Sequence, residues 1–370
     1  MIPKEVFEQT LLKFLEPVRP FLDDPSVSEV MINGPDRIFV ERKGKLYLTD
    51  ARFASREALT ATLRNLAQYV GRHIDEHRPI LEARLPDGSR VEAVLPPAAP
   101  DGPMVAIRRF FRETLTIDRL IELGSFTPDS AMLLRAIVGV KQNIIVAGGT
   151  GSGKTSLLNA LTGFIHDDER IVIIEDTREV QCQQEHVVQL EARPPDSRGR
   201  GQVTIRDLFK ATLRMRPDRI VVGEIRSAEA LDLVQAMTSG HGGCMATVHA
   251  THSLDVVNRL ETMALMSDVE LPLTALRSQV ASAVDFILHT ARLADGSRCV
   301  TQLTEVLGYD GAAGYRFADL FVRRYGRRGH GGETRSQLVA TGAQPGCAEL
   351  IRAMGIALPD SMRAPAEVGR

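Results

Sequence analysis

Short apolar segments alternate with polar turns over the first 112 residues. Within these segments apolar and polar side chains alternate, and turn signals such as Pro86-Asp87-Gly88 separate them, which predicts β-strands. Apolar residues at helical spacing predict helices over 5–16 and 55–70, the second with Ser55 as its N-cap. We therefore expect a compact α+β domain in this part of the chain.

Farther along, the pattern changes to continuous apolar segments that alternate with amphipathic ones. Such alternation is typical of βαβ units, and it predicts an α/β fold with a mainly parallel sheet. A hairpin around Ala294-Asp295-Gly296 closes this region. We expect an α+β domain over 1–112, a linker over 113–125, an α/β domain over 126–325 and a tail over 326–370. The expected strands are 143–148, 170–176, 186–192, 219–224 and 244–250, and the expected helices are about 154–164, 204–215, 227–238, 272–284 and 347–355.

The composition of the 370 residues is that of a soluble globular protein, with 44% apolar and 25% charged residues. A net charge of −2 gives no global attraction to nucleic acid or anionic lipid. Four scattered cysteines without metal-ligand spacing are typical of a reducing compartment. Because the chain shows neither a secretory signal nor an apolar stretch of about 20 residues, we expect a cytoplasmic protein with only peripheral membrane contact.

One motif carries the most specific chemistry: Gly-Gly-Thr-Gly-Ser-Gly-Lys-Thr, between an expected strand and an expected helix. Glycines at such a junction let backbone N–H groups surround a phosphate, and the helix N-terminus adds partial positive charge. We expect Lys154 to reach the β- and γ-phosphates of ATP, and Thr155 to place its hydroxyl on Mg²⁺. The expected nucleotide-binding residues of this P-loop are Gly148, Gly149, Thr150, Gly151, Ser152, Gly153, Lys154, Thr155 and Ser156.

Two carboxylates at predicted strand ends are candidates for chemistry beside the P-loop. We expect the strand that ends in Glu224 to lie next to the P-loop strand, so that Glu224 polarises the attacking water or holds Mg²⁺ through water. Most P-loop enzymes carry Asp where this chain has Gly223, which weakens direct metal ligation. Glu175 is a second candidate for the water or Mg²⁺, because strand ends of an open α/β sheet converge on the ligand crevice. Its neighbour Asp176 is open to a helix-capping role.

Histidines flank the expected strand 244–250. His241 lies in a Gly-rich turn before this strand, and His249 lies at its carboxyl end. We expect His249 to sense the γ-phosphate or to contact a neighbouring subunit. The two histidines do not make a metal site, because no further ligands accompany them.

Four segments in this order resemble the motifs of one ATPase superfamily. GGTGSGKT, IIEDT, RMRPDRIVVGEIR and GHGGCMATVHA resemble the Walker A, Asp box, Walker B and His box of the ATPases that drive type II and type IV secretion and type IV pili. Segments outside these motifs, such as DPSVSEVMINGPDRIFVERKGKL, resemble the tight-adherence (Tad/Cpa) pilus assembly ATPases in particular. The resemblance covers nearly the whole chain from about residue 17. The Arg-rich loop ARPPDSRGRGQ and the GHGGC turn depart from the pattern.

This resemblance implies a RecA-like P-loop ATPase core, preceded by a smaller α+β domain and assembled as a hexameric ring. It also implies that the smaller domain supplies arginines that close over ATP, where a guanidinium neutralises charge in the transition state. The implied partner is a polytopic inner-membrane platform protein, which associates the cytoplasmic ATPase with the inner membrane. The arginines that match are Arg84, Arg90 and Arg108, and weaker candidates for subunit contacts are Arg214, Arg216 and Arg226.

The main alternative is a RecA-like nucleic-acid translocase or helicase, since such enzymes also form rings. Against it stand the net charge, the 5% of aromatic residues without Trp, and the lack of an evident stacking platform. We therefore expect no nucleic-acid partner. The chain has no LSGGQ-like signature of an ABC-type subunit and no Asn-Lys pair that would read guanine in a GTPase. We expect the basic cluster of Arg323-Arg324 with Arg327-Arg328 to form a solvated face.

Overall fold

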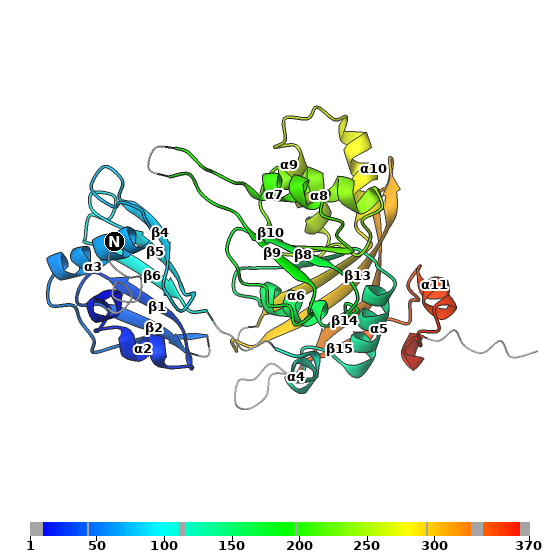
Figure 1. Ribbon diagram of the computed structural model, residues 1–370. Coiled ribbons are helices and arrows are strands. Elements are labelled where there is room, and N and C mark those ends of the chain that lie inside the picture. The colour runs from blue at the N-terminus through cyan, green and yellow to red at the C-terminus, as the bar shows by residue number, and fades with distance from the viewer. Residues whose placement is uncertain are drawn as a thin grey trace, which may run out of the picture. The chain divides into compact units, whose positions relative to one another are not determined.

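The computed structural model describes residues 10–42, 44–110, 115–196, 199–293, 295–326 and 336–362. The chain divides into two compact units, residues 1–112 with 195–200 and residues 113–194 with 201–370. Each unit contains its own sheet (Figure 1). The fold is therefore of the mixed α/β type that the alternating pattern predicted.

The first unit is built on an antiparallel sheet of six strands within the described residues, in the order β3-β2-β1-β6-β5-β4. Helix α3 (Arg56–Tyr69) packs Leu59, Leu63 and Leu66 into the core on one face of this sheet. Ser55 caps α3 as predicted, because its Oγ accepts a hydrogen bond from the Ala58 amide at 3.2 Å. The strands are β1 (Val27–Asn33), β2 (Ile38–Arg42), β3 (Lys45–Leu48), β4 (Ile80–Arg84), β5 (Arg90–Val94) and β6 (Met104–Arg108).

The beginning of the first unit agrees with the predicted N-terminal helix as far as the structure describes it. Residues 10–14 are helical, while residues 5–9 of the prediction lie outside the described residues. Leu11 and Leu15 are buried in the same core as α3. A short helix, α2 (Arg19–Asp23), follows.

The second unit holds a sheet of nine described strands in the order β15-β14-β13-β12-β7-β11-β10-β8-β9. The strands from β12 to β9 are mutually parallel, and the three at the other edge are antiparallel. The five predicted strands of this region and the predicted hairpin are confirmed. The strands are β7 (Ile144–Gly148), β8 (Ile171–Glu175), β9 (Val187–Glu191), β10 (Arg219–Ile225), β11 (Met245–His249), β12 (Phe286–Arg292), β13 (Arg298–Asp310), β14 (Gly314–Tyr325) and β15 (Ser336–Ala340).

One expectation about strand order is wrong. Strand β10, which carries Glu224, does not pair with the P-loop strand β7, because β11 lies between them and pairs with both. The order of strands depends on pairing between distant segments, which the local pattern does not encode.

Helices cover both faces of the parallel strands (Figure 1). On β7, Ile144 and Val146 face the core with α5 and α6, whereas Ile145 and Ala147 face the core with α7, α8, α9 and α10. Burial on both faces explains the continuous apolar runs in the sequence. The helices are α4 (Ile117–Glu122), α5 (Pro128–Gly139), α6 (Lys154–Thr162), α7 (Ile205–Thr212), α8 (Glu229–Thr238), α9 (Asp255–Ala264), α10 (Leu273–Ala283) and α11 (Ala348–Ala353).

The C-terminal residues contribute to the core of the second unit. Strand β15 adds the edge strand beside β14, and Leu338, Ile351 and Met362 are buried in the core with α5 and α6. The expected solvated face is wrong at Arg323, whose guanidinium is buried and donates to the carbonyl oxygens of Val300, Gly124 and Ser125. Arg327 and Arg328 lie outside the described residues.

Candidate active site

The P-loop connects the carboxyl end of β7 to the first turn of α6. Gly151 and Gly153 have φ angles of +67° and +98°, which favour glycine, and Gly153 is the residue before the helix. A Cβ on Gly148 would lie 2.3 Å from the Thr290 carbonyl oxygen and 2.5 Å from Ser152 Oγ. These contacts explain the glycines, and they leave backbone N–H groups at the N-terminus of α6 available for an anion.

Lys154, in the first turn of α6, begins a chain of contacts that leads to the ends of two strands. Its side chain is buried, and its Nζ donates to the Gly149 carbonyl oxygen at 3.1 Å and lies 3.3 Å from both ring nitrogens of His249. His249 Nε2 lies 2.7 Å from Glu224 Oε1. The parallel strands β7, β11 and β10 end at the same edge, so the structure brings together Lys154, His249 and Glu224.

The charge state of His249 follows from this arrangement. Burial and the positive charge of Lys154 lower the pKa of His249 and outweigh the opposite effect of Glu224. A neutral imidazole can accept a hydrogen bond from the Lys154 ammonium group, whereas a positively charged imidazolium would repel that group. The site therefore favours neutral His249.

Glu224 is also held by an arginine on its own strand end. Arg226 Nε donates to Glu224 Oε2 at 2.9 Å, and Arg226 Nη1 donates to Asp176 Oδ2 at 2.6 Å. Asp176 thus binds Arg226. The helix-capping interpretation is wrong, because the next element after β8 is the strand β9 and no helix begins at Asp176. From the sequence, Arg226 is a candidate only for contacts with another subunit, and its link to Glu224 is not predicted. The close spacing of Glu224 and Arg226 was the available signal.

Glu175 is the most buried carboxylate of the site. Its residue is 2% exposed, and its Oε1 accepts hydrogen bonds from the backbone amides of Glu179 and Val180 at 2.9 and 2.8 Å. Among the described residues no hydrogen-bond partner reaches Oε2. Burial raises the pKa of this carboxyl to about 7, despite the two amide hydrogen bonds. The carboxyl can therefore take up or release a proton near neutral pH.

Gly223 makes room for Glu175. A Cβ at position 223 would lie 2.8 Å from Glu175 Cγ and 3.1 Å from its Oε1. The carboxylate from β8 thus fills the space that a side chain on β10 would occupy. Sequence reasoning noted the unusual Gly223 but missed its cause, since the two residues meet only through the pairing of β8 with β10.

The donors at this edge suit a hard cation. Thr155 Oγ1 donates to Glu179 Oε2 at 3.4 Å, and the carboxylates of Glu175 and Glu224 come from neighbouring strands. Within the described residues no cluster of three or more His, Cys, Asp or Glu side chains is arranged to hold a metal by itself. Mg²⁺ usually takes one or two protein oxygens and completes its shell with waters and phosphates. This donor set fits that mode of binding.

The three predicted N-terminal arginines lie in the first unit and form a row. Arg84 on β4 is directly opposite Arg90 on β5, which is directly opposite Arg108 on β6. Residues directly opposite each other lie on the same face of a sheet, and like charges in such pairs are destabilising. The structure therefore gathers these arginines on one face of the sheet, where Arg90 also lies 3.6 Å from the carboxylate of Glu82.

A cavity of about 470 Å³ lies beside the P-loop in the second unit. Gly149, Thr150 and His249 line one side of it, and helix α9 lines the other. Helix α9 is not among the helices expected from the sequence. Its buried residues recur at helical spacing and would have revealed it: Val256, Val257, Leu260, Met263 and Ala264.

Comparisons with known proteins identify the family of the chain. The pattern of the family described as type II/IV secretion system protein matches residues 12–324. A Mycobacterium tuberculosis protein named for conjugal transfer is 37% identical over 292 residues, covering 77% of this chain and 82% of that protein. The type IV secretion system protein PtlH of Bordetella pertussis is 33% identical over 305 residues, covering 76% of this chain and 90% of that protein.

Solved structures share the fold. The Legionella pneumophila ATPase DotB matches 80% of this chain and 79% of its own chain with a TM-score of 0.53 and 21% identity. At this identity the likeness concerns the fold alone. Among the described residues, no helix combines the length and the apolar composition that crossing a bilayer requires.

Proposed function

This chain belongs to the type II/IV secretion system protein family, and we propose that it is the Mg²⁺-dependent ATPase motor of a tight-adherence (Tad-type) pilus assembly or type II/IV secretion machine. The observation that carries the proposal is the chain of contacts from Lys154 through His249 to Glu224, beside a P-loop. The sequence motifs that resemble Tad ATPases support the specific assignment.

The residues of this edge divide the work of hydrolysis. The P-loop amides and Lys154 bind the β- and γ-phosphates, which leaves Glu224 to accept a proton from the attacking water. Neutral His249 lies between Lys154 and Glu224, 3.3 Å from the lysine Nζ and 2.7 Å from the glutamate Oε1. Thr155, with Glu175 and Glu224, would hold Mg²⁺, which neutralises charge on the phosphates when it is bound.

The first unit supplies charge for the transition state. Arg84, Arg90 and Arg108 share one face of its sheet, and a guanidinium suits the oxygens of a transferring phosphoryl group. We assign the row to ATP that is bound at the P-loop. In this proposal the second unit is a RecA-like core.

The working assembly is a homo-hexameric ring in the cytoplasm, attached to the inner membrane through a polytopic platform protein. Hydrolysis in the ring drives movements that are passed to that partner. Light scattering on the purified chain should detect rings whose population rises with a non-hydrolysable ATP analogue. Monomer alone at micromolar concentration with nucleotide present would count against the ring.

Replacement of Lys154 tests the ATPase assignment. Lys154→Ala removes the group expected to contact phosphate, so we expect turnover of ATP to vanish while the far-UV circular dichroism stays that of the wild type. Steady-state phosphate release measures turnover. A folded Lys154→Ala protein that hydrolyses ATP at the wild-type rate would refute the assignment.

A nucleic-acid translocase is the second candidate, since the same row of Arg84, Arg90 and Arg108 could bind a phosphodiester backbone. The two functions differ in what stimulates hydrolysis. A translocase should hydrolyse ATP faster when single- or double-stranded DNA is added at low salt, and a pilus or secretion motor should not. Strong stimulation by DNA would favour the translocase.

A further inference from the structure

Helix α9 presents a polar stripe to the cavity beside the P-loop. Asp255, Asn258, Arg259 and Thr262 line this cavity, and their spacing places them on one side of the helix. The opposite side of α9 carries apolar residues that are buried in the core of the unit. The core thus fixes the orientation of the helix and aims the stripe at Gly149, Thr150 and His249.

Arg259 differs from other arginines of this region in its partners. Arg226 is paired with Glu224, and Arg277 with Glu261. Within the part of the chain that the structure describes, no hydrogen bond or ion pair engages the Arg259 guanidinium. Its positive charge nevertheless reaches His249, where it adds to burial and to Lys154 in lowering the histidine pKa. The cavity therefore contains an arginine, and the P-loop residues that line the same cavity, Gly149 and Thr150, offer it no negative charge.

The position of the cavity indicates which phosphate would meet this charge. A phosphate cradled by a P-loop sits on the backbone amides at the helix N-terminus, here at Gly153 and Lys154. The cavity is instead lined by Gly149 and Thr150, at the beginning of the loop, and by His249. A triphosphate whose β-phosphate bound these amides would extend its terminal phosphoryl group past Lys154 toward His249. A diphosphate would end before it.

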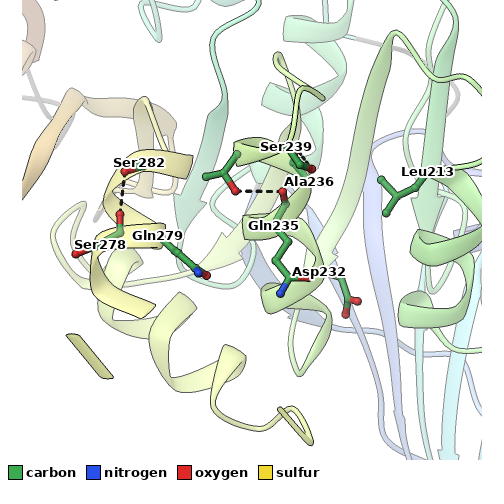
Figure 2. Close-up of a pocket in the computed structure, with 9 residues that line it drawn as sticks. Leu213, Asp232, Gln235, Ala236, Ser239, Ser278, Gln279 and Ser282 are labelled. Atoms are coloured by element: carbon green, nitrogen blue, oxygen red, sulfur yellow. Dashed lines mark hydrogen bonds between the residues drawn. The ribbon is translucent and has the colours of Figure 1, made fainter. Parts of the chain in front are cut away.

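A second, larger hollow does not offer this chemistry. It has a volume of about 640 Å³ and lies between α8 and α10, where Gln279 extends from α10 (Figure 2). Its described lining contains no arginine or lysine, and its single carboxylate, Asp232, is paired with Arg206 at 2.9 Å. An anion would find no cation in its walls. Of these two hollows, the smaller one offers an arginine to a phosphate.

We propose that Arg259 recognises the terminal phosphoryl group of ATP from the α9 side and thereby lets the site distinguish ATP from ADP. This inference rests on the proposed ATPase function. A guanidinium suits the task because it is always charged and presents several N–H donors in a plane. Arg259 then acts in binding, whereas Glu224 acts on the water.

The test compares affinities for a non-hydrolysable ATP analogue and for ADP, each with Mg²⁺, by calorimetry on the full chain. We expect Arg259→Ala to weaken binding of the analogue roughly 10- to 100-fold, the effect of losing a charge-assisted hydrogen bond. The affinity for ADP should stay within about twofold, and Arg259→Lys should recover part of the loss. Arg352→Ala, at an exposed arginine of α11, is the matched control and should change neither affinity.

Each other outcome has a defined meaning. Equal losses for the analogue and ADP, or no loss for either, would overturn the role of Arg259. Arg259→Lys supplies the same comparison if the alanine variant does not fold, since it keeps the charge but loses the planar donors. Lys154→Ala distinguishes a failure of the ATPase proposal from a failure of the role assigned to Arg259. If Lys154→Ala still binds both nucleotides normally, the ATPase proposal fails. If Lys154→Ala loses them and Arg259→Ala behaves as wild type, only this inference fails.

Discussion

The contact between Gly223 and Glu175 predicts a specific clash. In Gly223→Ala the new Cβ would lie 2.8 Å from Glu175 Cγ, and two backbone amides hold the glutamate in place. Overpacking of a well-packed interior lowers the free energy of unfolding by about 1–3 kcal/mol. Replacement of a flexible glycine in a strand by alanine raises it by roughly 0.5–1 kcal/mol. The destabilisation by the clash should exceed the gain from removing the glycine. We expect a net loss of about 1–2 kcal/mol, which lowers Tm by about 2–4 °C per kcal/mol.

A double-mutant cycle identifies the cause of that loss. Glu175→Ala removes Cγ and Oε1, and the nearest remaining atom, Glu175 Cβ, lies at an ordinary 3.4 Å. Gly223→Ala should therefore cost little in the Glu175→Ala background, giving a coupling energy of about 1 kcal/mol or more by thermal unfolding of the full chain. Gly311→Ala is the matched control, because its Cβ would meet no atom within 4 Å. An equal cost of Gly223→Ala in both backgrounds would refute the reasoning.

Two further predictions concern charge. Because the folded-state pKa of Glu175 is raised from 4.5 to about 7, its contribution to the free energy of unfolding is complete below pH 4.5 and is lost as pH rises through 7. The loss amounts to about 3 kcal/mol at most. The free energy of unfolding in urea should therefore differ less between pH 5 and pH 8 for Glu175→Gln than for the wild type. Equal differences in the two proteins would contradict this role of Glu175. Replacement of Arg84, Arg90 or Arg108 by Ala should lower kcat about 10- to 100-fold for each variant. The affinity for ATP, measured in a Glu224→Gln background, should stay nearly unchanged. Full turnover in all three variants would make these arginines ordinary surface charges.

Local patterns predicted the elements of the fold well where burial is regular. Strand β8 is buried at every position, so its apolar run was recognisable without knowledge of its neighbours. The P-loop could also be located, because phosphate binding requires glycines and a lysine in continuous sequence. His249 and Glu224 could be selected one by one, since each stands at or beside the end of a predicted strand.

What the sequence could not supply are relations between distant segments. The separation of β10 from β7 by β11 is a matter of pairing order, and the burial of Glu175 depends on a glycine on the neighbouring strand. Arg323 resembled a solvated residue within a basic cluster, but three carbonyl oxygens from other segments satisfy its guanidinium in the interior. Arg259 was missed together with its helix. In each case the environment of the side chain arises only after folding.

The central claim is that Glu224 activates water for ATP hydrolysis at this P-loop, and turnover by Glu224→Gln tests it most directly. The substitution keeps the shape of the side chain and removes its basicity, so phosphate release with ATP and Mg²⁺ should fall about 10²–10⁴-fold. Calorimetric binding of ATP should stay within about threefold of wild type, because Glu224 is not needed for the ground state. Glu175→Gln, assayed in parallel, is the comparison. If Glu224→Gln hydrolyses ATP at nearly the wild-type rate while Glu175→Gln does not, the account of the site is wrong.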